Sequence, residues 1–216
     1  MTHGYDTRPV RSRLDDDDDE DDDEVDTSKK APKIADFLGK SLLENRIIMV
    51  AKPVDRELMA QITSQLLVLD QDDPKAPITM YINCPGGDAD SGFGIYDAMT
   101  AIRAPVHTVC CGMAASAAIL IFLGGAKGKR YTTPHSRFLI HQPSSGARGQ
   151  ASDLEITANE IVKLREAYNK IIAKECGQTE KKVLADADRD FWLTADEAVE
   201  YGLASKILKS LKDIGG

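Results

Sequence analysis

The sequence predicts an α/β fold built on a largely parallel sheet, and three observations lead to this prediction. Short apolar runs typical of buried strands alternate with longer segments whose apolar residues recur at helical spacing. Two of these strands lead through short turns into helices, and such β-turn-α units bring successive strands into parallel pairs. The length of 216 residues and the hydrophobic content of 42% are typical of one compact domain.

In the first half of the chain, helical and strand-like patterns follow one another closely. Order should begin near Ile34, where apolar residues share one face of a short helix. The helix expected next has a single stripe of leucine and isoleucine. The predicted elements are a helix from about 34, a strand over 46–50, a helix over 55–69, a strand over 78–82 that enters the turn 83–87, a helix over about 91–102 and a strand over 106–111.

In the second half, one helix is much longer than the others. It is expected over 152–176, with Ile161, Leu164 and Tyr168 on one side. The final short helix should start at the capping box formed by Thr194 and Glu197 and end at Gly202. The remaining predicted elements are a helix over 116–123 and a strand over 137–140.

The net charge of -8 is concentrated in one segment, because all ten residues over 15–24 are acidic. Without them, 27 basic residues face 25 acidic ones, for a balance of about +2. This lacks the basic surface that neutralises phosphates, so nucleic acid is not an expected partner. Residues 1–30 hold few large apolar side chains, and their like charges repel. We therefore predict a disordered acidic tail over 1–30 and a folded domain over 31–216.

The four cysteines indicate a reducing compartment. Cys110 and Cys111 are adjacent in a strand-like run, so their side chains should point to opposite faces, and a disulfide framework is not expected. Paired C-x-x-C spacing is absent, which argues against a structural zinc site. Neither an apolar leader core nor a run of about 18 apolar residues is present. The sequence thus predicts a cytoplasmic protein without a membrane span.

Two strand-to-helix turns could carry chemistry, because helix N-termini present unpaired N–H groups. In the first, Gly86 and Gly87 would let backbone N–H groups point into a cleft, although an isolated Pro-Gly-Gly is also a common tight turn. In the second, small neighbours would expose the hydroxyl of Ser116, with the N–H of Ala117 beside it to bind an oxyanion. Ser116 could instead simply cap its helix.

A serine nucleophile needs a base and an acid. Of the four histidines, His141 is the best placed, since it ends a predicted strand before a glycine-containing loop. Three acids precede the next apolar run, namely Asp186, Asp188 and Asp190, and their spacing does not choose among them. Without further information, a Ser-His-Asp hydrolase is therefore one hypothesis among several for these residues.

Taken together, the ordered motifs resemble the Clp protease proteolytic subunit over nearly all of 46–208. The segments that carry the resemblance are Arg-Ile-Ile at 46–48, Tyr-Ile-Asn-Cys-Pro-Gly-Gly at 81–87, Gly-Met-Ala-Ala-Ser at 112–116, Gly-Gly-Ala-Lys-Gly-Lys-Arg at 124–130, Ile-His-Gln-Pro at 140–143, Gly-Gln-Ala-Ser-Asp at 149–153 and the run 194–203.

The resemblance implies a role for each matching position. It places the nucleophile of a serine peptidase at Ser116, the base at His141 and the acid at Asp190. The oxyanion donors fall on the N–H groups of Gly87 and Ala117. No cofactor or metal is implied.

The resemblance also implies a ClpP/crotonase-type fold with a protruding handle helix, the handle covering about 144–176. It implies two stacked heptameric rings that enclose a chamber, with Asp188 and Arg189 at the ring junction. The expected partner is a hexameric AAA+ unfoldase that feeds unfolded polypeptides into the chamber. Cys84 departs from the serine usual in this family, and Asp88 places a charge where relatives often have an apolar residue.

Two alternatives belong to other functional classes. The chain could be a weakly active assembly subunit of a mixed ring with an active paralogue. It could also belong to the crotonase branch of the fold, whose oxyanion N–H groups hold an acyl-CoA thioester. The crotonase chemistry would not need the set of Ser116, His141 and Asp190, so the presence of all three favours the peptidase.

Overall fold

The computed structural model describes residues 34–143, 146 and 148–214. The tail predicted over 1–30 lies outside the described residues, as do positions 144, 145 and 147 of the loop before the predicted handle.

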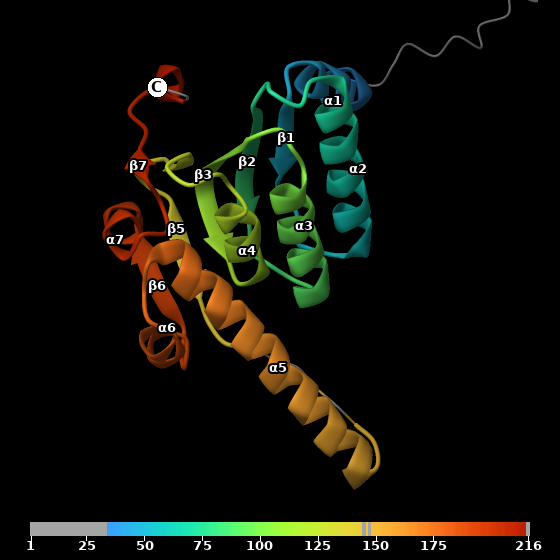
Figure 1. The fold of residues 1–216 in the computed structure, drawn as a ribbon, viewed down its shortest axis with the longest axis vertical. Helices are drawn as coiled ribbons and strands as arrows, with labels where there is room; N and C mark the ends of the chain where they lie inside the picture. The colour runs from blue at the N-terminus through green and yellow to red at the C-terminus, as the bar shows by residue number, and fades with distance from the viewer. Residues whose placement is uncertain (1–33, 144–145, 147, 215–216) are drawn as a thin grey trace, which may run out of the picture.

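Helices and strands alternate along most of this part of the chain (Figure 1). In chain order they are α1 (Ile34–Glu44), β1 (Ile47–Val50), α2 (Arg56–Asp72), β2 (Ile78–Cys84), α3 (Ala89–Ala101), β3 (Val106–Ala115), α4 (Ala117–Leu123), β4 (Arg130–Thr132), β5 (Arg137–Ile140), α5 (Ala151–Cys176), α6 (Glu180–Asp186), β6 (Phe191–Thr194), α7 (Ala195–Tyr201), β7 (Lys206–Ile207) and the short 3₁₀ turn η1 (Leu211–Asp213).

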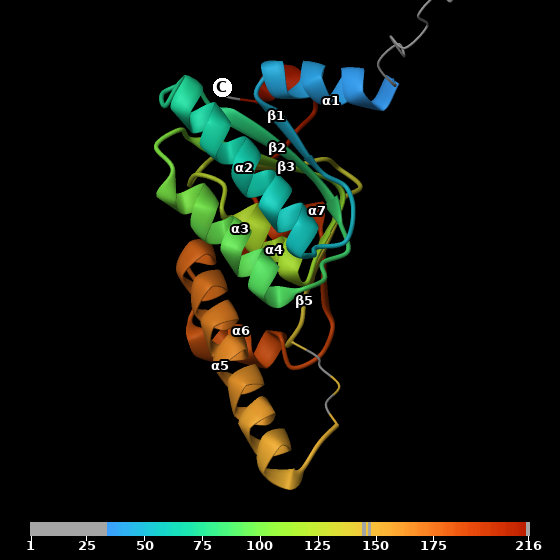
Figure 2. The same cartoon turned by 90° about the vertical axis from the view of Figure 1, so that its right-hand side faces the viewer.

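The strands form one sheet that is parallel except at a single pair. Its main path runs β1-β2-β3-β4-β7, and all of these neighbours are parallel. The end of β3 also pairs with β5 in parallel, and β5 pairs with β6 antiparallel. Helices α2 and α3 lie side by side against the sheet (Figures 1 and 2). The predicted α/β fold with a largely parallel sheet is confirmed.

Several elements differ from the sequence prediction. Strand β3 continues to Ala115, four residues beyond the predicted end, because the small residues after Cys111 still pair with β5. Strands β4, β6 and β7 and helix α6 were not predicted. Each of these strands has two to four residues, too few for a periodic pattern to form.

The hydrophobic core contains the residues that were predicted to lie on the buried faces of the helices. Leu58, Ile62, Leu66 and Leu69 of α2 are all buried. Every residue of α4 is buried as well, so this helix is enclosed on all sides. A helix fixed in this way can hold its N-terminus in a constant position relative to the sheet.

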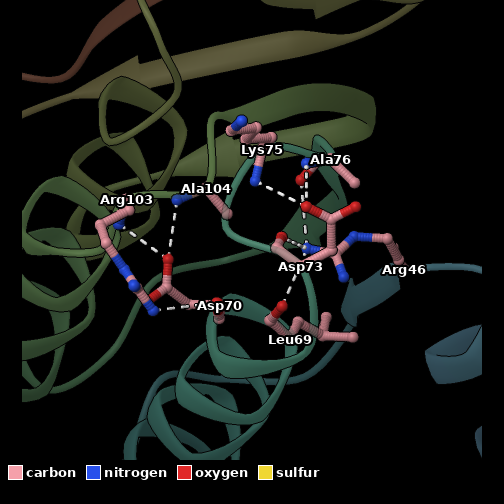
Figure 3. A network of polar contacts seen from close by, with 8 residues as sticks. All are labelled: Arg46, Leu69, Asp70, Asp73, Lys75, Ala76, Arg103 and Ala104. Carbon is pink, nitrogen blue, oxygen red and sulfur yellow. Dashed lines mark hydrogen bonds and ion pairs between the residues drawn. The ribbon is translucent and has the colours of Figure 1, made fainter.

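A polar network closes the end of the sheet opposite to the turns that follow β2 and β3 (Figure 3). The Asp70 carboxylate accepts the N–H groups of Arg103 and Ala104, both at 2.8 Å, and pairs with the Arg103 guanidinium at 3.0 Å. The Ala104 N–H is the main reason that the pKa of Asp70 lies below its ordinary value. On the other side, Arg46 donates to the carbonyl oxygens of Leu69 and Asp73. The network thereby joins the end of α2 to the residue before β1 and to the segment between α3 and β3.

Helix α5 projects from the body of the molecule (Figures 1 and 2). Its buried residues all lie in its last nine positions, from Tyr168 to Cys176. Toward its start, Leu154 and Ile156 are exposed. The protruding helix predicted for the handle is therefore present. Across the described ranges, no helix is both long and apolar enough to cross a membrane.

Candidate active site

The turn between β2 and α3 presents a free backbone N–H. Val54 forms a bridge with this turn: its N–H donates to the carbonyl of Gly86 at 2.8 Å, and its carbonyl accepts the N–H of Asp88 at 2.8 Å. Because successive peptide groups of extended backbone face opposite sides, the N–H of Gly87 points away from Val54. Among the described residues it has no acceptor, so it is available to a ligand.

Side chains on either side of this turn hold it in place. The thiol of Cys84 donates to the carbonyl of Lys52 and accepts the N–H of Gly86, which lets a cysteine serve at this position. Burial raises the pKa of the Cys84 thiol, so it remains protonated. Asp88 is the N-cap of α3 and accepts the N–H of Ser91 at 2.8 Å and its hydroxyl at 2.5 Å. These two bonds lower the pKa of Asp88.

The turn between β3 and α4 places Ser116 in an unusual conformation. Its φ of 56° and ψ of -125° lie in a region that L-residues rarely adopt. Ser116 stands at the N-cap position, but its side chain makes no capping bond. Simple helix capping therefore does not explain this serine. Ala117 is the first residue of α4, where backbone N–H groups have no intrahelical acceptor.

The two turns are packed directly against each other. A Cβ atom on Gly86 would lie 2.5 Å from the carbonyl oxygen of Ala115 and 2.6 Å from the Cβ of Ser116. Glycine at this position is therefore required by the close approach as well as by its φ of 89°. The contact brings the two turns together, and Gly87, Ser116 and Ala117 line the same cavity.

A cavity of about 250 Å³ opens at this junction. Four of the residues singled out by the sequence line it together: Gly87, Ser116, Ala117 and His141. The cavity has an apolar side formed by α3, α4 and the middle of α5, to which Phe93, Leu120, Ile161, Leu164 and Tyr168 contribute. Acidic residues from the start of α3, Asp88 and Asp90, line it as well.

Asp190 is not part of this cavity. It lies in an adjacent open hollow of about 500 Å³ together with His141, Gln142, Asp188 and Arg189. His141 lines both spaces and so lies between Ser116 and Asp190. Within the part of the chain that the structure describes, no hydrogen bond joins His141 to either residue, and Asp190 is exposed. The predicted set is thus gathered in one region without being linked.

Gln142 connects the His141 segment to the loop that carries the acid. Its backbone N–H donates to the carbonyl of Ala187 at 2.9 Å, and its side-chain amide donates to the carbonyl of Asp188 at 3.0 Å. From α5, Arg165 donates to the Gln142 side chain at 3.4 Å. These bonds tie three segments that are distant in the sequence to one another.

Sequence reasoning did not assign Tyr168 or Asp90 to the site. The signal for Tyr168 was present, because Ile161, Leu164 and Tyr168 were predicted to share one side of the long helix. That side proves to face the cavity. The signal could not show that the phenol of Tyr168 reaches the nucleophile turn. Within the described ranges, no group of three or more potential metal ligands is found.

Comparison with known proteins decides the family. The sequence profile of the Clp protease family matches residues 29–211. This chain belongs to the Clp protease family. A relative from Treponema denticola, an ATP-dependent Clp protease proteolytic subunit 2, is 49% identical over 179 residues, which cover 83% of this chain and 90% of that protein. A solved structure of a single-residue mutant of ClpP1 from Listeria monocytogenes superposes with a TM-score of 0.75 at 35% identity, covering 81% of this chain and 98% of that one.

Membership makes this Clp protease chain a peptidase of the serine class and confirms the predicted ClpP-type fold. The match includes both turns, the cavity and α5, since it extends from residue 29 to residue 211.

Proposed function

We propose that this chain is a serine endopeptidase in which Ser116 is the nucleophile. The observation that carries the proposal is the shared cavity, which Ser116 lines together with His141 and with residues of both strand-to-helix turns. An uncapped serine in a rarely adopted conformation at such a place is what a nucleophile requires, since its hydroxyl must stand free of the helix that it starts.

The chemistry follows from these positions. The Ser116 hydroxyl attacks the carbonyl carbon of a peptide bond while His141 takes its proton, and the oxyanion that forms accepts the N–H groups of Gly87 and Ala117. His141 then gives the proton to the leaving amine, and the C–N bond breaks to leave an acyl-enzyme. A water molecule, deprotonated by His141, hydrolyses the ester. Asp190 would hold the imidazole in the required tautomer once the two side chains come into hydrogen-bond reach.

The proposal extends to the assembly. We place the active chain in two stacked heptameric rings in the cytoplasm, fed with unfolded polypeptides by an AAA+ unfoldase. The relative from Treponema denticola is named as ATP-dependent, which supports such a partner. Asp188 and Arg189 are exposed next to Asp190, so a ring contact at these two residues would act directly on the position of the acid.

The nucleophile is tested by reacting the purified protein with a fluorophosphonate and locating the adduct by mass spectrometry. The label should be found on Ser116. Ser116→Ala should lose both labelling and peptide cleavage, because removing a triad nucleophile costs about 10⁶ in turnover in well-studied enzymes. Ser64→Ala, on the outer side of α2, serves as the matched control and should behave as the unmodified protein. Peptidase activity retained in Ser116→Ala would refute the proposal.

The ring junction is tested separately with Arg189→Ala, which should reduce ring pairing in sedimentation and peptidase activity together. Lys75→Ala, another exposed cation that lies in the α2–β2 loop, is the control. If Arg189→Ala remained fully assembled and active, Arg189 would be an ordinary surface residue.

A further inference from the structure

One buried phenol contacts the backbone of the nucleophile turn. The hydroxyl of Tyr168, on α5, donates to the carbonyl oxygen of Ser116 at 3.2 Å. The same oxygen accepts the N–H of Ile119 at 2.9 Å. Tyr168 is only 5% exposed and lines the cavity. The carbonyl of Ser116 is thus held from two sides, once by its own helix and once by a residue more than 50 positions away.

This carbonyl belongs to the same peptide group as the N–H of Ala117. A peptide group is planar, and its C=O and N–H point in opposite directions. Fixing the oxygen of Ser116 therefore fixes the direction of the Ala117 N–H. A hydrogen bond to the oxygen also polarises the group and makes its N–H a stronger donor.

The conformation of Ser116 makes such support necessary. Its φ of 56° is strained for a residue with a side chain, and strained turns persist only where their surroundings hold them. The hydrogen bond from the Ile119 N–H lies within α4, so it would move together with that helix. The Tyr168 bond comes from another element, so it can fix the peptide relative to the rest of the cavity.

We propose that Tyr168 is a positioning residue that orients and polarises the peptide supplying the Ala117 oxyanion donor. This role rests on the function proposed above, since it requires an oxyanion at this place. Tyr168 acts through the Ser116–Ala117 peptide and does not touch the reacting atoms.

The surroundings of Tyr168 suit a permanent donor. Burial raises the pKa of Tyr168 above its ordinary value, so the phenol keeps its proton throughout the neutral range. The base of α5 is anchored by the partly buried pair of Arg130 and Glu175, whose charged atoms lie 2.6 Å apart. Tyr96 of α3 adds a hydrogen bond to Glu175 at 3.3 Å. The helix that carries the phenol is therefore fixed to the body just beyond it.

The test replaces only the hydroxyl. Tyr168→Phe keeps the ring in the cavity wall, and it should lower kcat on a short fluorogenic peptide by about three- to tenfold, the range expected for one hydrogen bond. KM should change by less than about twofold. Affinity for a peptide boronate, whose adduct with Ser116 places an oxygen in the oxyanion site, should fall by the same factor as kcat. Affinity for the amine-side product peptide, which has no oxygen at the oxyanion site, should stay constant.

A matched control and a rescue separate positioning from packing. Tyr96→Phe removes another phenol hydroxyl that bonds to α5, but outside the cavity. Because the shorter contact between Arg130 and Glu175 still anchors the base of α5, this variant should leave kcat unchanged. Incorporation of 4-aminophenylalanine at position 168 restores a donor at the end of the ring and should recover most of the lost kcat. A residue that only filled space would give no such recovery.

The possible results are decisive. An unchanged kcat in Tyr168→Phe, or a loss that lies entirely in KM, would overturn the inference. If that variant failed to assemble in sedimentation, Tyr168→Met would take its place, with the same kcat loss expected. Failure of both variants to assemble would assign Tyr168 to packing and also overturn the inference. Labelling of Ser116 by fluorophosphonate decides the proposed function independently, so the two ideas can fail separately.

Discussion

The two strand-to-helix turns of this protein both require a backbone conformation with positive φ, but they place different residue types in it. Both follow neighbouring parallel strands, and both contain a residue with positive φ. The turn after β2 uses Gly86 and Gly87, for which this conformation is easy, and its helix is properly capped by Asp88. The turn after β3 uses Ser116, which is strained and leaves its helix without a side-chain cap.

The difference indicates which turn carries the reacting group. In the first turn, residue type and conformation agree, so stability alone explains its sequence. In the second turn they conflict, and glycine at position 116 would be better for stability. A local conflict of this kind is expected at functional sites, where a side chain is retained despite its cost. Substitutions at three positions test this comparison.

The largest effect is expected from Gly87→Ala, which disrupts the turn between β2 and α3. A Cβ atom at this position would lie 2.2 Å from the carbonyl oxygen of Val54, so the bridge must open and the free N–H must move. Losing one oxyanion donor lowers kcat by about 100-fold or more, which a peptidase assay would detect. The control is Gly128→Ala, where φ is also positive but no atom lies within 4 Å. Wild-type kcat in Gly87→Ala would remove Gly87 from the site.

A smaller effect should distinguish two inactive variants at position 116. Ser116→Gly relieves the strained φ of the second turn, whereas Ser116→Ala retains it. We expect the free energy of unfolding of Ser116→Gly to exceed that of Ser116→Ala by about 1 to 2 kcal/mol, as measured by urea denaturation. A glycine variant no more stable than the alanine variant would show that the turn stores no strain.

The smallest effect concerns the cap of the first turn. Asp88→Ala should lower stability by about 1 kcal/mol through loss of the cap on α3, which corresponds to a decrease in Tm of about 2 to 4 °C. The lowered pKa of Asp88 means that its contribution is complete above the ordinary value of 3.8 and is lost as the pH falls through the folded-state value.

The difference in Tm between the wild-type protein and Asp88→Ala should therefore shrink as the pH falls below about 3.8. Asp88→Asn keeps an acceptor oxygen that does not titrate, so the difference in Tm between Asp88→Asn and Asp88→Ala should not change over the same pH range. A constant difference down to pH 3 would mean that the carboxylate is not the cap.

The parts of the fold that the sequence predicted are those with repeated, periodic signals. The stripe from Leu58 to Leu69 predicted a helix and its buried face correctly, and the capping box at Thr194 marked the true start of α7. Strand β4 has three residues, and its pairing depends on the position of β3 in space. Nothing within so short a segment reports that position, which is why β4 was missed.

The candidate site was predicted residue by residue where local conformation decides it. Ser116 and Gly87 sit at turns whose composition already marked them. By contrast, Asp190 could be chosen over Asp186 and Asp188 only through the family resemblance, and its distance from the cavity could not be foreseen. The contact of Tyr168 with Ser116 also depends on the angle at which α5 meets the body, a property of tertiary packing.

The projecting helix has a mechanical consequence. Residues 151–167 of α5 span about 26 Å at 1.5 Å per residue. Tyr168, which follows them, is the first buried residue of the helix, so it lies near the point about which the helix would tilt. A tilt of about 10° around this point moves the tip by about 4 Å and moves an atom at about 6 Å from the helix axis by about 1 Å. A displacement of that size would break the bond from the phenol to Ser116. Any force that holds the tip of α5 therefore also sets the alignment of the nucleophile turn.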